Sequence, residues 1–278
     1  METPERVACA TIEDVNRFCD AVAIESKKRD VPANVYREMQ YYGYIEPMEL
    51  KHNDIEVRPD TETGQHVFAT APIPAHTIIT FYPVHALGRD ERIAYSDTDP
   101  IFVERIERYA RTHARYVRPL SAPKKAKLDN SEQPTDNKEP QQDYGTVLVV
   151  GNPNNTNNTR LLGHAIRDAC DTNVFTDTPF QKIKEWTTFK NKVAAYYMAS
   201  AKKHNCFFVG NNRHTLICIE TTRDIEAGEE LLVMLGPEHW FRRTYVKKDD
   251  HNLCDYLFEL LTQDGEFNTW REKLYSDK

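Results

Sequence analysis

The sequence lacks several features that mark common protein classes. Its 278 residues carry a formal net charge of -7, so it lacks the cationic surface with which proteins displace counterions from nucleic acid. It has no apolar run of the ~18 residues that a membrane-spanning helix needs. Its first residues show no basic segment followed by an apolar one, so we expect no signal peptide. We therefore expect an intracellular protein, nuclear or cytoplasmic, with no direct nucleic-acid or membrane partner.

The sequence also lacks closely spaced cysteines. Six cysteines lie far apart, and none forms a Cys-x-x-Cys pair, so we expect no structural zinc and no metal site. Free buried thiols in a reducing compartment are the simpler interpretation. Cys170 lies near His164 and Asp168 and could form a nucleophile–base arrangement. A reactive thiolate needs an electropositive niche, so we expect Cys170 to be structural.

The N-terminal residues 1–54 predict a helical segment. Thr11 is a typical N-cap and Asp14 follows at the third helical position, which is a capping-box pattern. Apolar residues then recur at helical spacing from residue 12 to residue 23. A second short helix is expected over residues 32–42.

Beyond residue 54, the apolar pattern changes to that of short strands with helices around them. We expect strands at residues 67–70, 77–82, 145–150, 206–209, 215–220 and 231–234. We expect helices at residues 101–117, 178–203, 252–261 and 269–274. The sequence therefore predicts a mainly β fold with flanking helices, of the α+β class.

Residues 121–143 consist almost wholly of charged and polar residues and proline. Such a stretch cannot bury enough apolar surface to offset its ordering entropy, so we expect a disordered insert. It contains Lys124, Lys125 and Lys127 directly after a proline, a pattern typical of a nuclear localisation signal. The alternative is a charged linker.

Two segments of the chain follow the same plan. Residues 68–79 and 219–231 each contain a strand, a threonine, an isoleucine three residues later, an alanine and a second strand. Two such hairpin-like units suggest a β-clip, a small twisted all-β scaffold.

Four blocks resemble, in order, the motifs of the SET-domain protein-lysine methyltransferases. Residues 63–82 are similar to the opening G-x-G-V-F-A-T and its following strand, and 163–170 to the N-H-S-C block. Residues 204–206 are similar to P-N-C, and 223–240 to the closing R-D-I-x-x-G-E-E-L and Y-G-x-x-Y-W. The resemblance implies a divergent SET domain over residues 55–241, with knot-like C-terminal threading. Inserts would lie at 88–143 and 171–203, and a helical segment at 242–278.

The resemblance implies S-adenosylmethionine as the cofactor, and a lysine substrate that enters a narrow channel from the opposite face. The cofactor-binding residues carried over from the family motifs are Gly64, Gln65, His66, Arg167, Asp168, Asn205 and Trp240. Methyl transfer in this family is an in-line displacement, so catalysis depends mainly on positioning. A desolvated channel helps to keep the substrate lysine neutral.

Three positions depart from the family pattern. Leu235 stands at the position of the principal catalytic tyrosine, Arg167 replaces the cofactor-binding asparagine, and His66 replaces the second glycine of the loop. Tyr82 is the remaining channel tyrosine. The Tyr196–Tyr197 pair of the inserted helix is either core or a replacement for the lost hydroxyl. Tyr82 and Tyr197 are therefore the candidate catalytic residues.

Three functions are consistent with these residues. The first is a methyltransferase that acts on a histone tail or another basic protein segment, which the acidic charge would favour. The second is a catalytically weak or inactive SET module that binds a peptide or a partner protein. The third is another β-clip protein, such as a carbohydrate-binding domain. Only the site can decide between them, because a fold does not fix a function.

Overall fold

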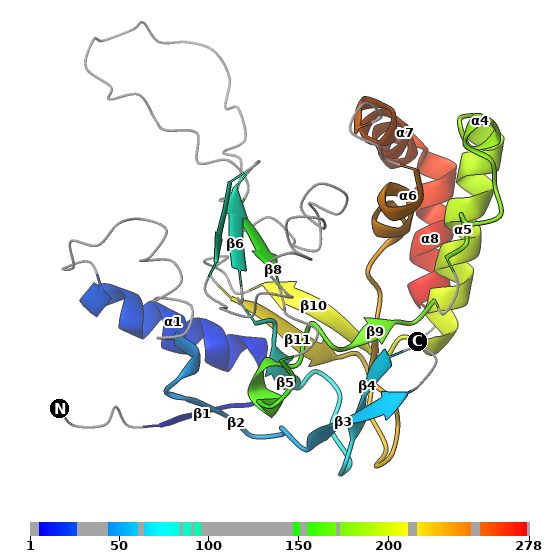
Figure 1. Ribbon diagram of the computed structural model, residues 1–278. Helices are drawn as coiled ribbons and strands as arrows, with labels where there is room; N and C mark the ends of the chain where they lie inside the picture. Colours follow the sequence, from blue (N-terminus) through cyan, green and yellow to red (C-terminus); the bar gives the residue numbers. More distant parts are fainter. Residues whose placement is uncertain are drawn as a thin grey trace, which may run out of the picture.

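The computed structural model describes residues 6–26, 44–60, 64–83, 86–89, 92–95, 147–150, 155–170, 173–210, 216–245 and 251–276 (Figure 1). The strands are β1 (Val7–Cys9), β2 (Met48–Leu50), β3 (Ile55–Asp60), β4 (Gly64–Ala69), β5 (Ile78–Phe81), β6 (Ala86–Arg89), β7 (Arg92–Tyr95), β8 (Val147–Val150), β9 (Arg167–Asp168), β10 (Cys206–Gly210), β11 (Ile217–Thr221) and β12 (Leu232–Val233). The helices are α1 (Ile12–Ser26), η1 (Thr159–Leu161), α4 (Phe180–Ile183), α5 (Trp186–Lys203), α6 (Pro237–Tyr245), α7 (His251–Gln263) and α8 (Gly265–Ser276).

Helix α1 begins where the sequence predicts. The Asp14 carboxylate accepts a hydrogen bond from the Thr11 amide at 3.1 Å, and the Asp14 amide donates to Thr11 Oγ1 at 3.3 Å. These reciprocal bonds satisfy amides that the first helical turn leaves without partners. The segment 1–54 is not purely helical, however, because β1 pairs in parallel with β2. Both strands have three residues, too few to show a period. The helix expected at 32–42 lies outside the described residues.

The two segments with the same plan pair with each other. Ile73 and Ile225 exchange both backbone hydrogen bonds, at 3.0 and 2.8 Å, and His76 and Gly228 take positive φ values of 55° and 84° at equivalent turns. Further backbone bonds join Ala69 to residues 228 and 229. The structure thus brings the two units together around one centre, as a β-clip requires.

The described strands form several small sheets. The three-stranded sheets have the orders β10-β11-β5 and β7-β6-β8, and the two-stranded sheets are β1-β2, β3-β4 and β9-β12. Each predicted strand coincides with or overlaps a strand of the structure. The mainly β fold with flanking helices is therefore confirmed. The knot-like threading stays a prediction, because residues 171–172, directly after β9, lie outside the described residues.

The helices α4 to α8 form a group on one side of the strands (Figure 1). Their shared core contains several buried aromatic side chains: Phe175, Phe189, Phe241, Tyr245 and Phe267. The helix predicted over 178–203 is interrupted at Glu185, which is extended with φ -72° and ψ 121°. Apolar residues recur at three-residue spacing across this break, at Ile183, Trp186 and Phe189, so the pattern did not reveal it. Among the described residues, no helix is both long and apolar enough to cross a bilayer.

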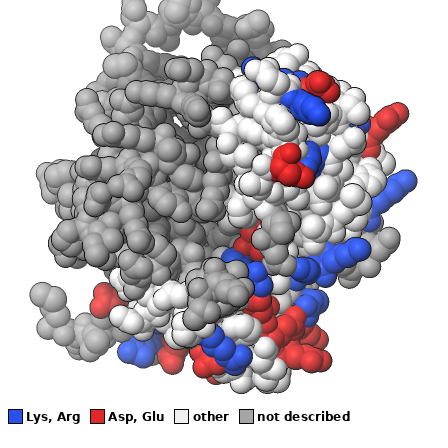
Figure 2. Space-filling view, turned by 45° about the vertical axis from the view of Figure 1, so that its right-hand side comes forward, with Lys and Arg blue, Asp and Glu red and all other residues white. Residues whose placement is uncertain are grey.

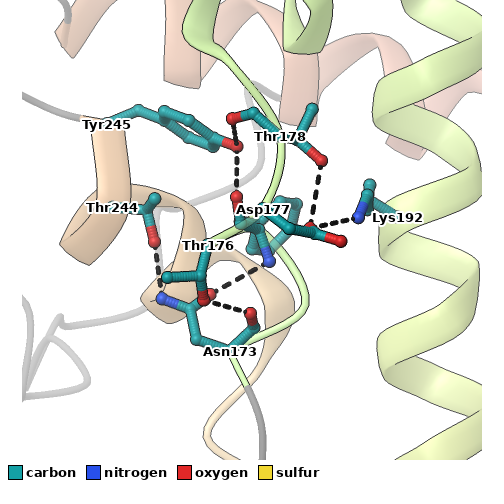
Figure 3. Close-up of polar contacts among 8 residues, drawn as sticks. Asn173, Thr176, Asp177, Thr178, Lys192, Thr244 and Tyr245 are labelled. Carbon is teal, nitrogen blue, oxygen red and sulfur yellow. Dashed lines mark hydrogen bonds and ion pairs between the residues drawn. The ribbon is translucent and has the colours of Figure 1, made fainter.

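The loop before α4 is fastened to α5 and α6 (Figure 3). Tyr245 donates its hydroxyl to the carbonyl oxygens of Phe175 and Thr178, at 2.6 and 2.7 Å. Asn173 donates to Thr244 at 2.6 Å, and Lys192 of α5 pairs with an Asp177 carboxylate oxygen at 2.7 Å. These contacts fix α5 relative to α6, which sets the position of the α5 tyrosines described below.

Candidate functional site

The four sequence blocks meet around the short parallel pair β9–β12. Arg167 lies opposite Leu232 and Asp168 opposite Val233. The Asn205 amide donates to the Leu232 carbonyl at 3.1 Å, and the Leu231 amide donates to the Val67 carbonyl of β4 at 2.8 Å. Residues from all four blocks, far apart in the sequence, therefore share one locality.

Asp168 is the centre of this locality. One carboxylate oxygen accepts from the Tyr196 hydroxyl at 2.8 Å, the Trp240 indole N–H at 2.9 Å and the Leu235 amide at 3.1 Å. The other oxygen accepts from the Cys170 amide at 2.8 Å. The Asp168 carboxylate thus joins β9, helix α5 and the segment that leads into α6. Its geometry is that of a positioning residue, and its contact with a cofactor stays a prediction.

Burial sets the electrostatics of this network. Desolvation raises the pKa of the Asp168 carboxyl, while its four hydrogen bonds oppose that shift. Desolvation and the Asp168 charge raise the pKa of the Tyr196 hydroxyl far above its ordinary value. Tyr196 is fully buried, and its hydroxyl also accepts from the Gly236 amide at 2.8 Å. This phenol therefore remains protonated and holds the backbone directly after Leu235.

Glu230 contacts both Arg167 and His66, which depart from the family pattern at predicted cofactor positions. Its carboxylate accepts from Arg167 Nε at 2.5 Å and from Arg167 Nη2 at 2.9 Å. The same carboxylate lies 2.9 Å from His66 Nδ1. A bidentate guanidinium–carboxylate pair is geometrically specific as well as strong. Arg167 and His66 are therefore not independent changes, because both partner one carboxylate that is mostly shielded from solvent.

Asn205 is only 1% exposed and is committed to the adjoining backbone. Its side-chain nitrogen donates to the Glu230 carbonyl at 2.8 Å and to the Glu229 carboxylate at 3.1 Å. Its side-chain oxygen accepts from the Leu232 amide at 2.8 Å. The side chain therefore clamps the segment that carries Glu230, and any contact with a cofactor would use other atoms.

The remaining predicted cofactor residues lie at the edges of the site. Gly64 lies opposite Asp60 at the end of the β3–β4 pair, and Gln65 lies next to it with an exposed side chain. Trp240 lies on α6, where its indole is held by Asp168 and its ring meets the His239 ring edge-on at 5.2 Å. Their roles in cofactor binding stay predictions.

The two predicted catalytic tyrosines lie in different surroundings. Tyr82 is 8% exposed, and its ring lies edge-on to His164 and Phe208, with centroid distances of 6.4 and 6.1 Å. Tyr197 points toward α8, where its ring lies 6.1 Å from Phe267. It is Tyr196, not Tyr197, that bonds to the backbone at position 236.

Sequence reasoning missed Tyr275 in α8. Its hydroxyl oxygen lies 3.1 Å from the sulfur of Met234, the residue before Leu235. Burial raises the pKa of the Tyr275 hydroxyl, and the Asp168 charge adds to that shift while the Arg271 charge opposes it. No motif could have identified this residue, because it lies beyond the last family block. Leu235 itself packs against the central apolar core.

The chemistry of the cysteines favours a structural role. All six are buried and free of disulfides. Burial raises the pKa of the Cys9 thiol to about 11 and raises those of Cys206 and Cys218 further. Raised thiol pKa values leave little of the reactive thiolate at neutral pH. Within the described ranges, no group of three or more His, Cys, Asp or Glu side chains could hold a metal ion.

Comparison with known proteins agrees with this geometry. The family model described as SET domain matches residues 64–234. That range begins at the glycine of β4 and ends directly before Leu235. A search of curated proteins gave no matching relative. The matched range covers more than half of the chain and contains Asp168 and Glu230, so this chain belongs to the SET-domain family.

Proposed function

We propose that this chain is an S-adenosylmethionine-dependent protein-lysine N-methyltransferase that acts on a basic protein segment. SET domains are in general protein-lysine methyltransferases, and the matched range contains the residues that meet around β9–β12. The observation that carries the proposal is the Arg167–Glu230 ion pair at the cofactor positions. This pair offers one charge of each sign beside the loop that begins at Gly64.

The donor set of this locality fits the cofactor. The amino-acid end of S-adenosylmethionine carries a carboxylate and an ammonium group. The Arg167 guanidinium is complementary to that carboxylate and the Glu230 carboxylate to that ammonium, so the protein's own ion pair could be exchanged for two pairs with the ligand. Backbone groups of Gly64, Gln65 and His66 would complete the binding surface. When bound, the cofactor supplies a methyl group on a positively charged sulfur.

The protein's own residues would bind and orient the two reactants. Asp168 fixes the backbone at Leu235 and the indole of Trp240, so the wall of the site is rigid. A desolvated site helps to keep the substrate lysine neutral, because burial penalises an ammonium. Reaction then depends on holding the lysine nitrogen in line with the methyl group.

The charge of the chain supports a basic substrate. The formal net charge is -7. Figure 2 shows side chains of both charges interspersed on the described part of one face, with several carboxylates gathered at its lower right edge. Such carboxylates attract Lys- and Arg-rich segments over distances of about a Debye length. A histone tail is one segment of this kind, and a histone substrate would require nuclear access.

Two measurements test the proposal. Calorimetry should detect binding of S-adenosylmethionine, and tritiated methyl groups should pass from it to core histones or to proteins of a cell lysate. Arg167→Ala should weaken cofactor binding by about tenfold or more, since a hydrogen bond to a charged group contributes roughly 1.5–3 kcal/mol. Arg17→Ala is the matched control, because Arg17 is 79% exposed on α1 and should not affect binding. Absence of cofactor binding by the wild-type protein would refute the proposal.

A second candidate is a SET module that binds a peptide without methylating it. Leu235 favours this candidate, because it places no hydroxyl at the position of the family's catalytic tyrosine. The same calorimetry separates the two. A module of this kind would bind a histone-tail peptide with unchanged affinity in the presence and absence of the cofactor, and it would release no labelled product.

A further inference from the structure

A methyltransferase with Leu235 needs another group to orient the substrate amine. The described tyrosines around this position are Tyr196, Tyr197 and Tyr275, which come from α5 and α8. Their rings form a chain, since Tyr197 lies edge-on to Tyr196 at 5.8 Å and to Tyr275 at 6.3 Å. The question is which of their hydroxyls is available to a substrate.

Tyr196 is committed to the protein. Its hydroxyl donates to the Asp168 carboxylate and accepts from the Gly236 amide, both at 2.8 Å, and its side chain is fully buried. Replacing these partners with a substrate amine would leave a buried carboxylate and a buried amide short of hydrogen bonds, which is unfavourable. We therefore assign Tyr196 to holding the backbone of the site, and not to binding the substrate.

Tyr275 has a weaker partner. Its hydroxyl lies 3.1 Å from the Met234 sulfur, and a thioether is a poor hydrogen-bond acceptor. The side chain is only partly buried. The hydroxyl oxygen keeps its lone pairs while it donates to the sulfur, so an amine that approached from the exposed side could donate an N–H to it. Met234 is the residue before Leu235, so the hydroxyl contacts the segment that has lost the family tyrosine.

The surroundings of Tyr275 hold its ring in place. The ring lies edge-on to the His204 ring at a centroid distance of 5.5 Å and to the Tyr197 ring at 6.3 Å. Figure 1 shows the C-terminal end of α8 close to β9. Residue 275 follows the matched family range by some forty positions, yet the fold returns it to the end of β12.

We infer that Tyr275 supplies the hydroxyl that position 235 lacks and that it orients the substrate lysine amine. This inference rests on the proposed methyltransferase function. The Tyr275 hydroxyl accepts an N–H of the neutral amine, so the nitrogen lone pair points toward the methyl group. Burial and the nearby Asp168 charge raise the pKa of this hydroxyl, so it remains protonated and neutral. Tyr275 is then the catalytic residue, and Tyr196 and Asp168 are positioning residues.

Steady-state methyl transfer from tritiated S-adenosylmethionine to core histones tests the inference. Tyr275→Phe keeps the ring and should lower kcat by at least tenfold, while cofactor affinity measured by calorimetry stays within about twofold. Tyr256→Phe is the matched control, because Tyr256 is 57% exposed on α7, and it should leave kcat unchanged. Leu235→Tyr added to Tyr275→Ala should restore part of the kcat that Tyr275→Ala loses. Tyr82→Phe and Tyr197→Phe test the two rival hydroxyls.

A stability cycle gives a readout that does not depend on activity. If a tyrosine at 235 would occupy the space beside Tyr275, Leu235→Tyr should destabilise the wild-type protein more than it destabilises Tyr275→Ala. The combined effect of the two substitutions on the unfolding equilibrium constant should then differ at least threefold from the product of their separate effects. An unchanged kcat in Tyr275→Phe, or an additive cycle, overturns the inference. A wild-type protein that binds no cofactor refutes the proposed function instead, and the cycle still decides the placement of Tyr275.

Discussion

Replacement of Asp168 by alanine is the sharpest test of the central hydrogen-bond network. Asp168→Ala removes the acceptor of the Tyr196 hydroxyl, the Trp240 indole and the backbone amides of Cys170 and Leu235. Because Asp168 is 5% exposed, water cannot replace these bonds without opening the structure. The variant should therefore lose both stability and the fixed geometry of the segment that leads into α6.

The size of the stability loss follows from the hydrogen-bond donors that Asp168→Ala leaves without an acceptor. Each buried group that loses its partner costs roughly 1–3 kcal/mol, but the four costs are not additive because the donors can relax together. The substitution also removes a desolvated carboxylate, as the raised pKa of Asp168 shows, and this offsets part of the loss. We expect a net decrease in the free energy of unfolding of about 3–5 kcal/mol, the range found when one partner of a buried charged network is removed.

Urea unfolding monitored by tryptophan fluorescence measures this decrease, with three variants for comparison. Asp168→Asn keeps one acceptor oxygen and should lose less. Tyr196→Phe removes one of the four donors and should cost about 1–3 kcal/mol. Asp177→Ala is the matched control, because this carboxylate is 79% exposed and pairs with Lys192, so it should cost under ~1 kcal/mol. If Asp168→Ala cost no more than Asp177→Ala, the network would not stabilise the fold.

Three further predictions concern other parts of the chain. Gly163→Ala should lower stability by about 1–3 kcal/mol in thermal unfolding, since a Cβ there would lie 3.0 Å from the Phe81 carbonyl oxygen; an unchanged midpoint would contradict the tight approach. Burial raises the pKa of Glu220 above its ordinary 4.5, so the folded state holds that proton more tightly. Stability should then fall as the pH rises from about 4.5 through the raised pKa, and Glu220→Gln should flatten this dependence in urea titrations; an equal slope would refute it. If residues 124–127 direct the chain to the nucleus, Lys124→Ala with Lys125→Ala should move a fluorescent fusion to the cytoplasm, and an unchanged distribution would leave them a charged linker.

Local patterns predicted much of the secondary structure, and their failures have physical reasons. The capping pair of Thr11 and Asp14 located the start of α1 because both partners lie within one helical turn. Short elements such as β9, with two residues, are held by their neighbours and show no period of their own. The break at Glu185 was missed because apolar residues recur every three positions across it, at Ile183, Trp186 and Phe189.

The candidate site was predictable as a set of positions, but not as a set of contacts. The ordered blocks identified His66, Arg167 and Asp168, and the fold brings their segments together. The sequence did not show that Arg167 and His66 share Glu230, since the partners of the ion pair are 63 positions apart. Nor could it show Tyr275 at Met234, across 41 positions. Contacts of this range depend on the whole fold, which a motif does not contain.

The departures from the family pattern are best understood in groups. A histidine in place of a loop glycine adds an imidazole at the predicted cofactor loop, and an arginine in place of an asparagine adds a cation. Both changes become compatible through Glu230, whose carboxylate accepts from Arg167 and lies 2.9 Å from His66 Nδ1. The hydroxyl that is missing at Leu235 has a counterpart in Tyr275 of α8. The Tyr275 hydroxyl contacts Met234, the residue before Leu235. Restoring a single family residue would leave its present partner without its bond. Activity should therefore depend on whether residues that contact one another are changed together, and not on the number of family residues restored.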